Sequence, residues 1–168
     1  MLASDSWMQV GEALTARGQR LFIVEAGAGG ALAATASARA GASRWFLGGL
    51  ACYHDSLKTG ALNLPAQVLV DHGAVSPVTV AELARGGQRL SGADWVLAES
   101  GVYGPGGGSP EKPVGCVYLS VSRGDAVCTG RQLKLSGDRA ALRQAVCEAA
   151  AAYLLERIAA ADISPRQI

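Results

Sequence analysis

Short apolar runs, each bounded by glycine or polar residues, recur along this chain and predict strands. The strands expected from these runs are residues 21–24, 45–53, 95–98, 116–122 and 126–135. We expect the strand at 45–53 to be buried, with another part of the backbone close to its two glycines, Gly48 and Gly49. The sequence Arg-Gly-Asp at residues 123–125 predicts a hairpin turn between the last two strands.

Apolar residues at three- and four-residue spacing predict helices between these strands. The longest helix is expected to follow an N-capping Asp138 and carries an apolar stripe from Leu142 to Ile158. Ser76 and Pro77 predict the start of another helix, because serine is a good N-cap and proline is tolerated in the first helical turn. Further helices are expected before Gly18, from Ala31 to Gly41 and at residues 54–62.

The alternation of strands and helices indicates an α/β fold. We expect a three-layer α/β/α sandwich with a mixed, mostly parallel sheet. The chain has 168 residues, enough for one sizeable core, so residues 1–168 are expected to form a single domain. Within it we expect an N-terminal helix in residues 1–19 and a frayed tail at residues 162–168.

Composition excludes several classes of function. Hydrophobic residues make up 49% of the chain and the net charge is +1, so neither disorder nor attraction to nucleic acid or a membrane is expected. The chain has no apolar run of about 18 residues and no basic stretch before an apolar one at its start, so we expect a cytoplasmic protein. The 4 cysteines lack a C-x-x-C pair and there are 2 histidines. We therefore expect reduced thiols, no metal and no cofactor.

Residues 104–115, with the sequence Gly-Pro-Gly-Gly-Gly-Ser-Pro-Glu-Lys-Pro-Val-Gly, form the most informative segment. The prolines restrict the backbone, whereas the glycines let a ligand approach it and let several N–H groups point at one anion. The segment follows a predicted buried strand, and open α/β sheets bind ligands at the carboxyl ends of their strands. We therefore expect a binding loop, although a glycine run by itself is usually a tight surface turn.

Five separated motifs occur in an order that is typical of a known family. They are residues 46–49 (Phe-Leu-Gly-Gly), Tyr53 with Lys58, residues 72–76 (His-Gly-Ala-Val-Ser), residues 104–115 and residues 137–139 (Gly-Asp-Arg). Together they resemble the C-terminal domain of the competence/damage-inducible protein CinA, a family whose active members are nicotinamide-nucleotide amidohydrolases. The resemblance covers residues 21–158 and implies the fold of that family and a homo-oligomer.

The chain departs from this family at the glycine turn after the first strand. The family reads A-E-S-C-T-G-G there, with the serine as nucleophile and a lysine further along the chain as its base. In this chain Ala26 stands at the position of the serine, Gly27 replaces the cysteine and Ala28 replaces the threonine. Lys58 keeps the spacing of the base, and Tyr53 also falls at its expected place. The resemblance therefore implies catalytic roles for Lys58 and Tyr53 but a missing nucleophile.

A second departure lies in the loop, where the family usually reads T-G-I-A-G-P-G-G. Residues 100–107 read Ser-Gly-Val-Tyr-Gly-Pro-Gly-Gly, so Tyr103 places a phenol where a methyl group is usual. Glu99 places a carboxylate just before this segment. Either side chain would fill part of a nucleotide pocket, and Glu99 would repel a phosphate.

Several residues have two readings. Glu25 either orients Lys58 or caps the glycine turn. Lys58 itself is either a pocket residue, as the family spacing implies, or a solvated surface lysine. Tyr53 is either a packed strand residue or a ligand contact. Ser100 and Cys52 are candidate substitute nucleophiles, but a relocated nucleophile must also meet oxyanion donors placed for the original one, so we expect neither to take this role.

Two functions from different classes follow. The first is a catalytically degenerate family member that acts as a binding or regulatory protein for a pyridine nucleotide or another small anionic ligand. The alternative is an active amidohydrolase for nicotinamide mononucleotide or a related small amide, using Lys58 with water or a relocated nucleophile. The expected ligand-binding residues are Glu25, Gly27, Gly29, Gly30, Ser100, Gly101, Gly104, Gly106 and Gly107.

Overall fold

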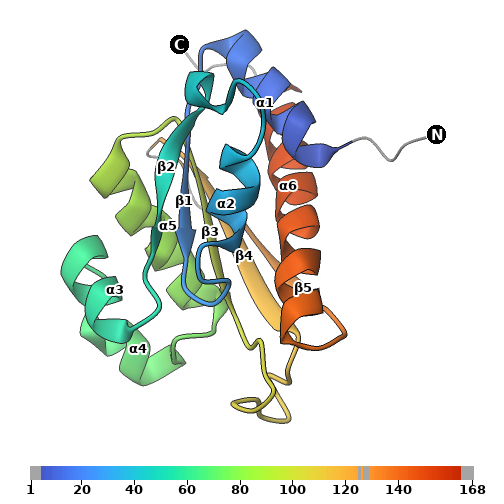
Figure 1. The fold of residues 1–168 in the computed structure, drawn as a ribbon. Helices are drawn as coiled ribbons and strands as arrows, with labels where there is room; N and C mark the ends of the chain where they lie inside the picture. The colour runs from blue at the N-terminus through green and yellow to red at the C-terminus, as the bar shows by residue number, and fades with distance from the viewer. Residues whose placement is uncertain (1–4, 125, 127–128, 164–168) are drawn as a thin grey trace.

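A five-stranded sheet in the order β2-β1-β3-β4-β5 forms the centre of the computed structural model, which describes residues 5–163 apart from 125, 127 and 128 (Figure 1). The strands are β1 (Leu21–Glu25), β2 (Phe46–Ala51), β3 (Trp95–Gly101), β4 (Cys116–Arg123) and β5 (Thr129–Lys134). β1 pairs in parallel with β2 and β3, whereas the β3–β4 and β4–β5 pairs are antiparallel. The expected mixed sheet is confirmed. It is less parallel than expected, because β3, β4 and β5 follow one another without the crossover helices that parallel pairs need.

Helices cover both faces of this sheet (Figure 1). They are α1 (Ser6–Arg17), α2 (Ala31–Ser37), α3 (Asp55–Leu62), α4 (Ala66–His72), α5 (Pro77–Ser91) and α6 (Arg139–Ile163), with a short 3-10 helix, η1 (Ala42–Arg44), before β2. The first, second and sixth helices lie on one face, and the third, fourth and fifth lie on the other. The expected three-layer α/β/α sandwich is confirmed.

Each face of the sheet has its own apolar core. On the side of α6, the predicted stripe buries Leu142, Leu154 and Ile158 against residues that include Trp7. On the other side, the buried Leu83 of α5 packs in a second cluster. A fully buried leucine or isoleucine contributes about 1.5–3 kcal/mol, so these stripes hold the helices against the sheet.

Capping residues begin and end the helices where the sequence indicates. The Ser76 hydroxyl accepts a hydrogen bond from the Thr79 N–H at 3.0 Å at the start of α5. The Asp138 carboxylate accepts one from the Ala141 N–H at 2.9 Å at the start of α6. Gly18 closes α1 in the left-handed conformation, with a φ of 62°. All three predicted boundaries are confirmed, because capping depends on local sequence.

The second strand differs from the expectation of a buried strand at residues 45–53. β2 lies at the edge of the sheet, and its residues alternate between half-buried and exposed. The expected close approach of backbone occurs at Gly49, where a Cβ would lie 3.1 Å from the Ile23 carbonyl oxygen, but not at Gly48, where the nearest atom is a side-chain atom of Phe22 at 3.9 Å. The preceding helix, α2, ends at Ser37, earlier than the expected Gly41.

One further helix and one helix boundary also differ from expectation. α4 was not anticipated, because its N-cap, Pro65, provides no side-chain hydrogen bond and none of its residues is buried. α6 continues through Ile163, so residues 162–163 are helical rather than frayed. The rest of the expected tail, residue 125 of the expected hairpin turn and residues 127–128 of the last expected strand lie outside the described residues.

Candidate functional site

A cavity of about 170 Å³ lies at the carboxyl ends of β1 and β3, where α3 and α6 begin. Its lining residues are Ala26, Gly27, Tyr53, Asp55, Lys58, Ala74, Val75, Ser100, Gly101, Tyr103 and Arg139. The location is the one expected for a ligand site in an open α/β sheet. Segments far apart in the sequence meet there, and seven of the residues singled out from the sequence line the cavity together: Ala26, Gly27, Tyr53, Lys58, Ser100, Gly101 and Tyr103.

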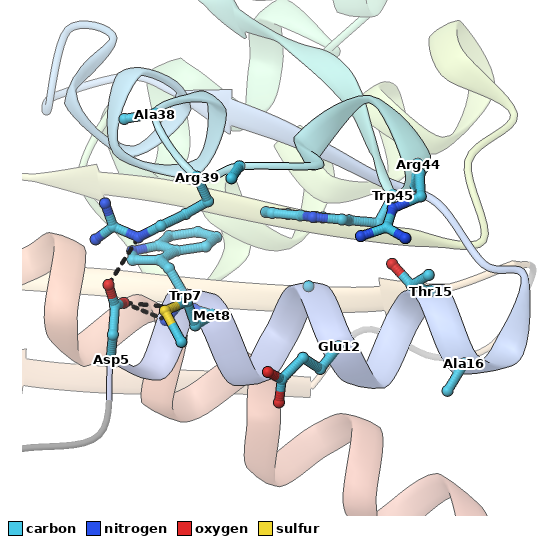
Figure 2. Close-up of a pocket in the computed structure, with 12 residues that line it drawn as sticks. Asp5, Trp7, Met8, Glu12, Thr15, Ala16, Ala38, Arg39, Arg44 and Trp45 are labelled. Atoms are coloured by element: carbon cyan, nitrogen blue, oxygen red, sulfur yellow. Dashed lines mark hydrogen bonds and ion pairs between the residues drawn. The ribbon is translucent and has the colours of Figure 1, made fainter.

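A larger groove of about 730 Å³ lies between α1 and the segment that joins α2 to β2 (Figure 2). The rings of Trp7 and Trp45 stack beside it with their centroids 6.4 Å apart. At one end Arg39 extends toward Asp5 and forms an ion pair at 2.8 Å. The groove is mainly apolar and none of the candidate catalytic or ligand-binding residues lines it, so the smaller cavity is the candidate site.

Glu25 caps the glycine turn that forms one wall of the cavity. Its buried carboxylate accepts hydrogen bonds from the backbone N–H groups of Gly30 and Leu32 at 3.0 Å and of Ala33 at 2.9 Å. Gly29 and Gly30 have φ values of 65° and 96°, which a residue with a side chain rarely adopts. Of the two roles considered for Glu25, the structure shows capping of the glycine turn. Glu25, Gly29 and Gly30 shape this turn but do not line the cavity.

Lys58 is a buried residue of the cavity rather than a surface lysine, with only 2% of it exposed. Its Nζ donates hydrogen bonds to the Tyr53 carbonyl oxygen at 3.1 Å and to Asp55 Oδ1 at 2.7 Å. The Asp55 side chain is half exposed at the rim. The methyl group of Ala26 shares the cavity with Lys58, so no hydroxyl is present at the position where the family has its serine.

Tyr53 lies at the mouth of the cavity and is 59% exposed. The reading as a packed strand residue is therefore wrong. Its hydroxyl accepts a hydrogen bond from Arg139 Nη2 at 3.1 Å, and Nη1 of the same guanidinium donates to the Gly104 carbonyl oxygen at 3.0 Å. Sequence reasoning did not assign Arg139 to the site. The sequence feature that could have pointed to Arg139 is the Gly-Asp-Arg motif at the start of the last helix.

Glu99 and Tyr103 form a buried pair beneath the glycine turn. Glu99 Oε2 accepts hydrogen bonds from the N–H groups of Gly27 at 3.1 Å and Ala28 at 2.9 Å, and Oε1 accepts one from the Tyr103 hydroxyl at 2.8 Å. Burial raises the pKa of Glu99 from 4.5 to about 7, although the donated hydrogen bonds act in the opposite direction. Burial also raises the pKa of Tyr103, which stays protonated. Glu99 does not itself line the cavity, but it hydrogen-bonds to Gly27 and Tyr103, which do, so its expected repulsion of a phosphate would act from behind this wall and stays a prediction.

The glycines of the loop divide into two groups. Gly101 lines the cavity and Gly104 supplies the carbonyl group that holds Arg139. Gly106 and Gly107 are exposed and do not line the cavity. Their predicted contact with a ligand therefore stays a prediction.

Among the described residues, no cluster of histidine, cysteine, aspartate and glutamate is arranged to hold a metal ion. Over the same part of the chain, no helix is long and apolar enough to span a membrane.

Comparison with known proteins decides the family. The sequence model described as the CinA C-terminal domain matches residues 4–158. The chain belongs to the CinA C-terminal domain family. The resemblance inferred from the separated motifs is thereby confirmed.

Relatives within the CinA family include both longer and similar-sized proteins. The nicotinamide-nucleotide amidohydrolase PncC of Escherichia coli K12 is 38% identical over 152 residues, which cover 89% of this chain and 88% of PncC. A CinA-like protein of Desulfotalea psychrophila is 41% identical over 80% of this chain, but this chain spans only 32% of that protein. Among solved structures, a CinA superfamily protein of Klebsiella pneumoniae matches with a TM-score of 0.87 and 33% identity, covering 92% of this chain and 96% of that one.

The two side chains considered as substitute nucleophiles in this CinA-family chain are both held in inert settings. The Ser100 hydroxyl donates a hydrogen bond to the Ala74 carbonyl oxygen at 2.7 Å, which keeps its proton away from a base. Cys52 is buried, and burial raises the pKa of its thiol to about 11. A thiol with that pKa supplies very little thiolate at neutral pH.

Proposed function

We propose that this CinA-family chain binds a small anionic ligand, a pyridine nucleotide or another small anion, and does not hydrolyse it. The observation that supports this most strongly is Ala26, which lines the cavity where the family pattern places its serine nucleophile. A methyl group cannot attack an amide or form a covalent intermediate. In a serine protease, loss of the nucleophile lowers kcat by about a millionfold.

The contacts of Lys58 favour binding over base catalysis. Its Nζ donates to a carboxylate and to a carbonyl group, a setting suited to a charged ammonium. A general base needs an unprotonated amine with a free lone pair. The described lining residues of the cavity include two cations, Lys58 and Arg139, and one carboxylate, Asp55, which pairs with Lys58. The net positive charge that remains in this concave site attracts an anion.

Ammonia release from nicotinamide mononucleotide tests the absence of hydrolysis. We expect no release above background from the purified wild type or from Lys58→Ala, with E. coli PncC as the positive control. Turnover by the wild type that Lys58→Ala abolishes would overturn the proposal. It would support the alternative, an amidohydrolase that uses Lys58 with water or a relocated nucleophile.

Thermal unfolding with added ligand tests binding, because a ligand that binds only the folded state raises Tm. The probes are inorganic phosphate, ribose 5-phosphate and nicotinamide mononucleotide. Arg139→Gln should weaken binding of the stabilising probe by about tenfold or more, since a charge-assisted contact is lost. Arg131→Gln is the matched control, because Arg131 is an exposed arginine that pairs with Glu156 away from the cavity. If no probe raises the Tm of the wild type, the binding function is wrong.

Two further features belong to the same proposal. As the family resemblance implies, we propose that the chain forms a homo-oligomer, which light scattering on the purified protein tests. A cytoplasmic location, expected from the sequence, is tested by cell fractionation.

A further inference from the structure

The ring of Tyr103 fills the space beside the glycine turn. Tyr103 lines the cavity yet is only 3% exposed. A Cβ on Gly27 would lie 2.6 Å from Tyr103 Cε2, 2.9 Å from the Gly101 carbonyl oxygen and 3.0 Å from Glu99 Oε1. Real Cβ atoms essentially never approach another heavy atom as closely as the first two distances. No room for a further group therefore remains between the ring and the backbone of Gly27.

Hydrogen bonds hold this ring in place. The Tyr103 hydroxyl donates to Glu99 Oε1, and Oε2 of the same carboxylate holds the N–H groups of Gly27 and Ala28. The ring and the turn are therefore bound to one buried group. A ligand that displaced the ring would break a buried hydrogen bond and leave its buried partner, Glu99, unsatisfied, which is costly.

The space that remains is small and bears positive charge. The cavity volume is about 170 Å³, below the roughly 300–1,000 Å³ of sites that enclose drug-sized ligands. Arg139 lies at its exposed mouth and Lys58 at its buried floor. These dimensions and charges fit a phosphate group with a small attached portion better than a nucleotide with an aromatic base.

We propose that Tyr103 is the specificity-determining residue of this cavity. Its ring limits the space in the cavity so that a small phosphomonoester fits, and Arg139 and Lys58 bind the phosphate of this ligand. The same ring excludes an aromatic base, such as nicotinamide, from the floor beside Ala26. This inference rests on the proposed anion-binding function and narrows it to one class of ligand.

Isothermal titration with three probes tests the proposal on the full chain: inorganic phosphate, ribose 5-phosphate and nicotinamide mononucleotide. We expect the wild type to bind ribose 5-phosphate about tenfold or more tightly than nicotinamide mononucleotide. In Tyr103→Ala that ratio should fall by about tenfold, through a gain in affinity for nicotinamide mononucleotide, because the ring no longer fills the floor. Tyr103→Phe keeps the ring and should keep the ratio, a result that a role for the hydroxyl alone would not give.

Tyr118→Ala is the matched control, because Tyr118 packs in the core on the other side of the sheet and does not line the cavity. If Tyr103→Ala does not fold, Tyr103→Leu removes the ring while retaining an apolar side chain, and the same fall in the ratio is expected. Equal affinity of the wild type for the two phosphomonoesters, or an unchanged ratio in the folded Tyr103 variant without a ring, would overturn this inference alone. Failure of all three probes to bind the wild type would overturn the anion-binding function as well.

Discussion

Replacing Glu99 with glutamine should change how the stability of the fold depends on pH. Glu99 is fully buried, and burial raises its pKa from 4.5 to about 7. An unfolded chain releases this proton near the ordinary value, whereas the folded chain keeps it until about neutral pH. The folded state therefore holds one more proton between the two values, and its free energy of unfolding falls as the pH rises through that range.

The size of the effect follows from the two pKa values. At about 1.4 kcal/mol for each pH unit, the full contribution is about 3 kcal/mol, present below the unfolded pKa and lost above the folded one. Between about pH 5 and about pH 8, the wild type should lose about 2–3 kcal/mol through this group alone. Glu99→Gln cannot ionise. It should be within about 1 kcal/mol of the wild type at the lower pH and about 2 kcal/mol more stable than it at the higher one.

Urea denaturation at the two pH values measures this difference. Glu148→Gln is the control, because Glu148 is exposed on α6 and should show the wild-type pH dependence. If the wild type and Glu99→Gln lose the same stability with rising pH, the burial of Glu99 does not carry the energetic cost argued above. If Glu99→Gln loses more stability than the wild type as the pH rises, the pKa of Glu99 is not raised in the folded state.

Two further substitutions test the packing and the caps by urea denaturation. Gly27→Ala should cost about 1–3 kcal/mol, because its methyl group would overlap the Tyr103 ring. The same change in a Tyr103→Ala background should cost less, because the overlap with the ring is gone and only the close approaches to the Gly101 carbonyl oxygen and Glu99 Oε1 remain, and equal costs in both backgrounds would contradict the overlap with the ring. Ser76→Ala should cost about 1 kcal/mol through loss of the N-cap bond to Thr79. Ser37→Ala is its control, because Ser37 is an exposed serine at the end of α2. Equal losses of unfolding free energy in the two variants would show that the N-cap bond does not stabilise the fold.

The fold was predictable where the signals are local. The N-caps Ser76 and Asp138 and the apolar stripe of α6 depend on residues within a few turns of one another, and each was predicted. The exposure of β2 was not predictable in this way, because an edge strand differs from a central one by its neighbours in the sheet. α4 was missed because it has neither a side-chain cap nor a buried stripe.

The site was predictable only in part. The spacing of Ala26, Tyr53 and Lys58 came from the family resemblance, and the structure places all three on one cavity. Arg139 is 86 residues from Tyr53, so their hydrogen bond has no local sequence signal. The contact between the ring of Tyr103 and the turn is equally remote in sequence. The burial of Glu99 depends on the assembled core, which no motif describes.

The overlap between Gly27 and Tyr103 also bears on whether this chain can return to the family pattern. A cysteine introduced at position 27 while Tyr103 remains would meet the ring at 2.6 Å. With Tyr103 replaced first, the cysteine would still approach the Gly101 carbonyl oxygen at 2.9 Å but would no longer meet the ring. The order of the two changes therefore matters, since the intermediate that keeps Tyr103 is more overpacked than the one that lacks it. Ala26→Ser alone would restore the hydroxyl and leave Gly27 and Tyr103 unchanged beside the same cavity, so recovery of the hydroxyl does not by itself recover the family pattern of the turn.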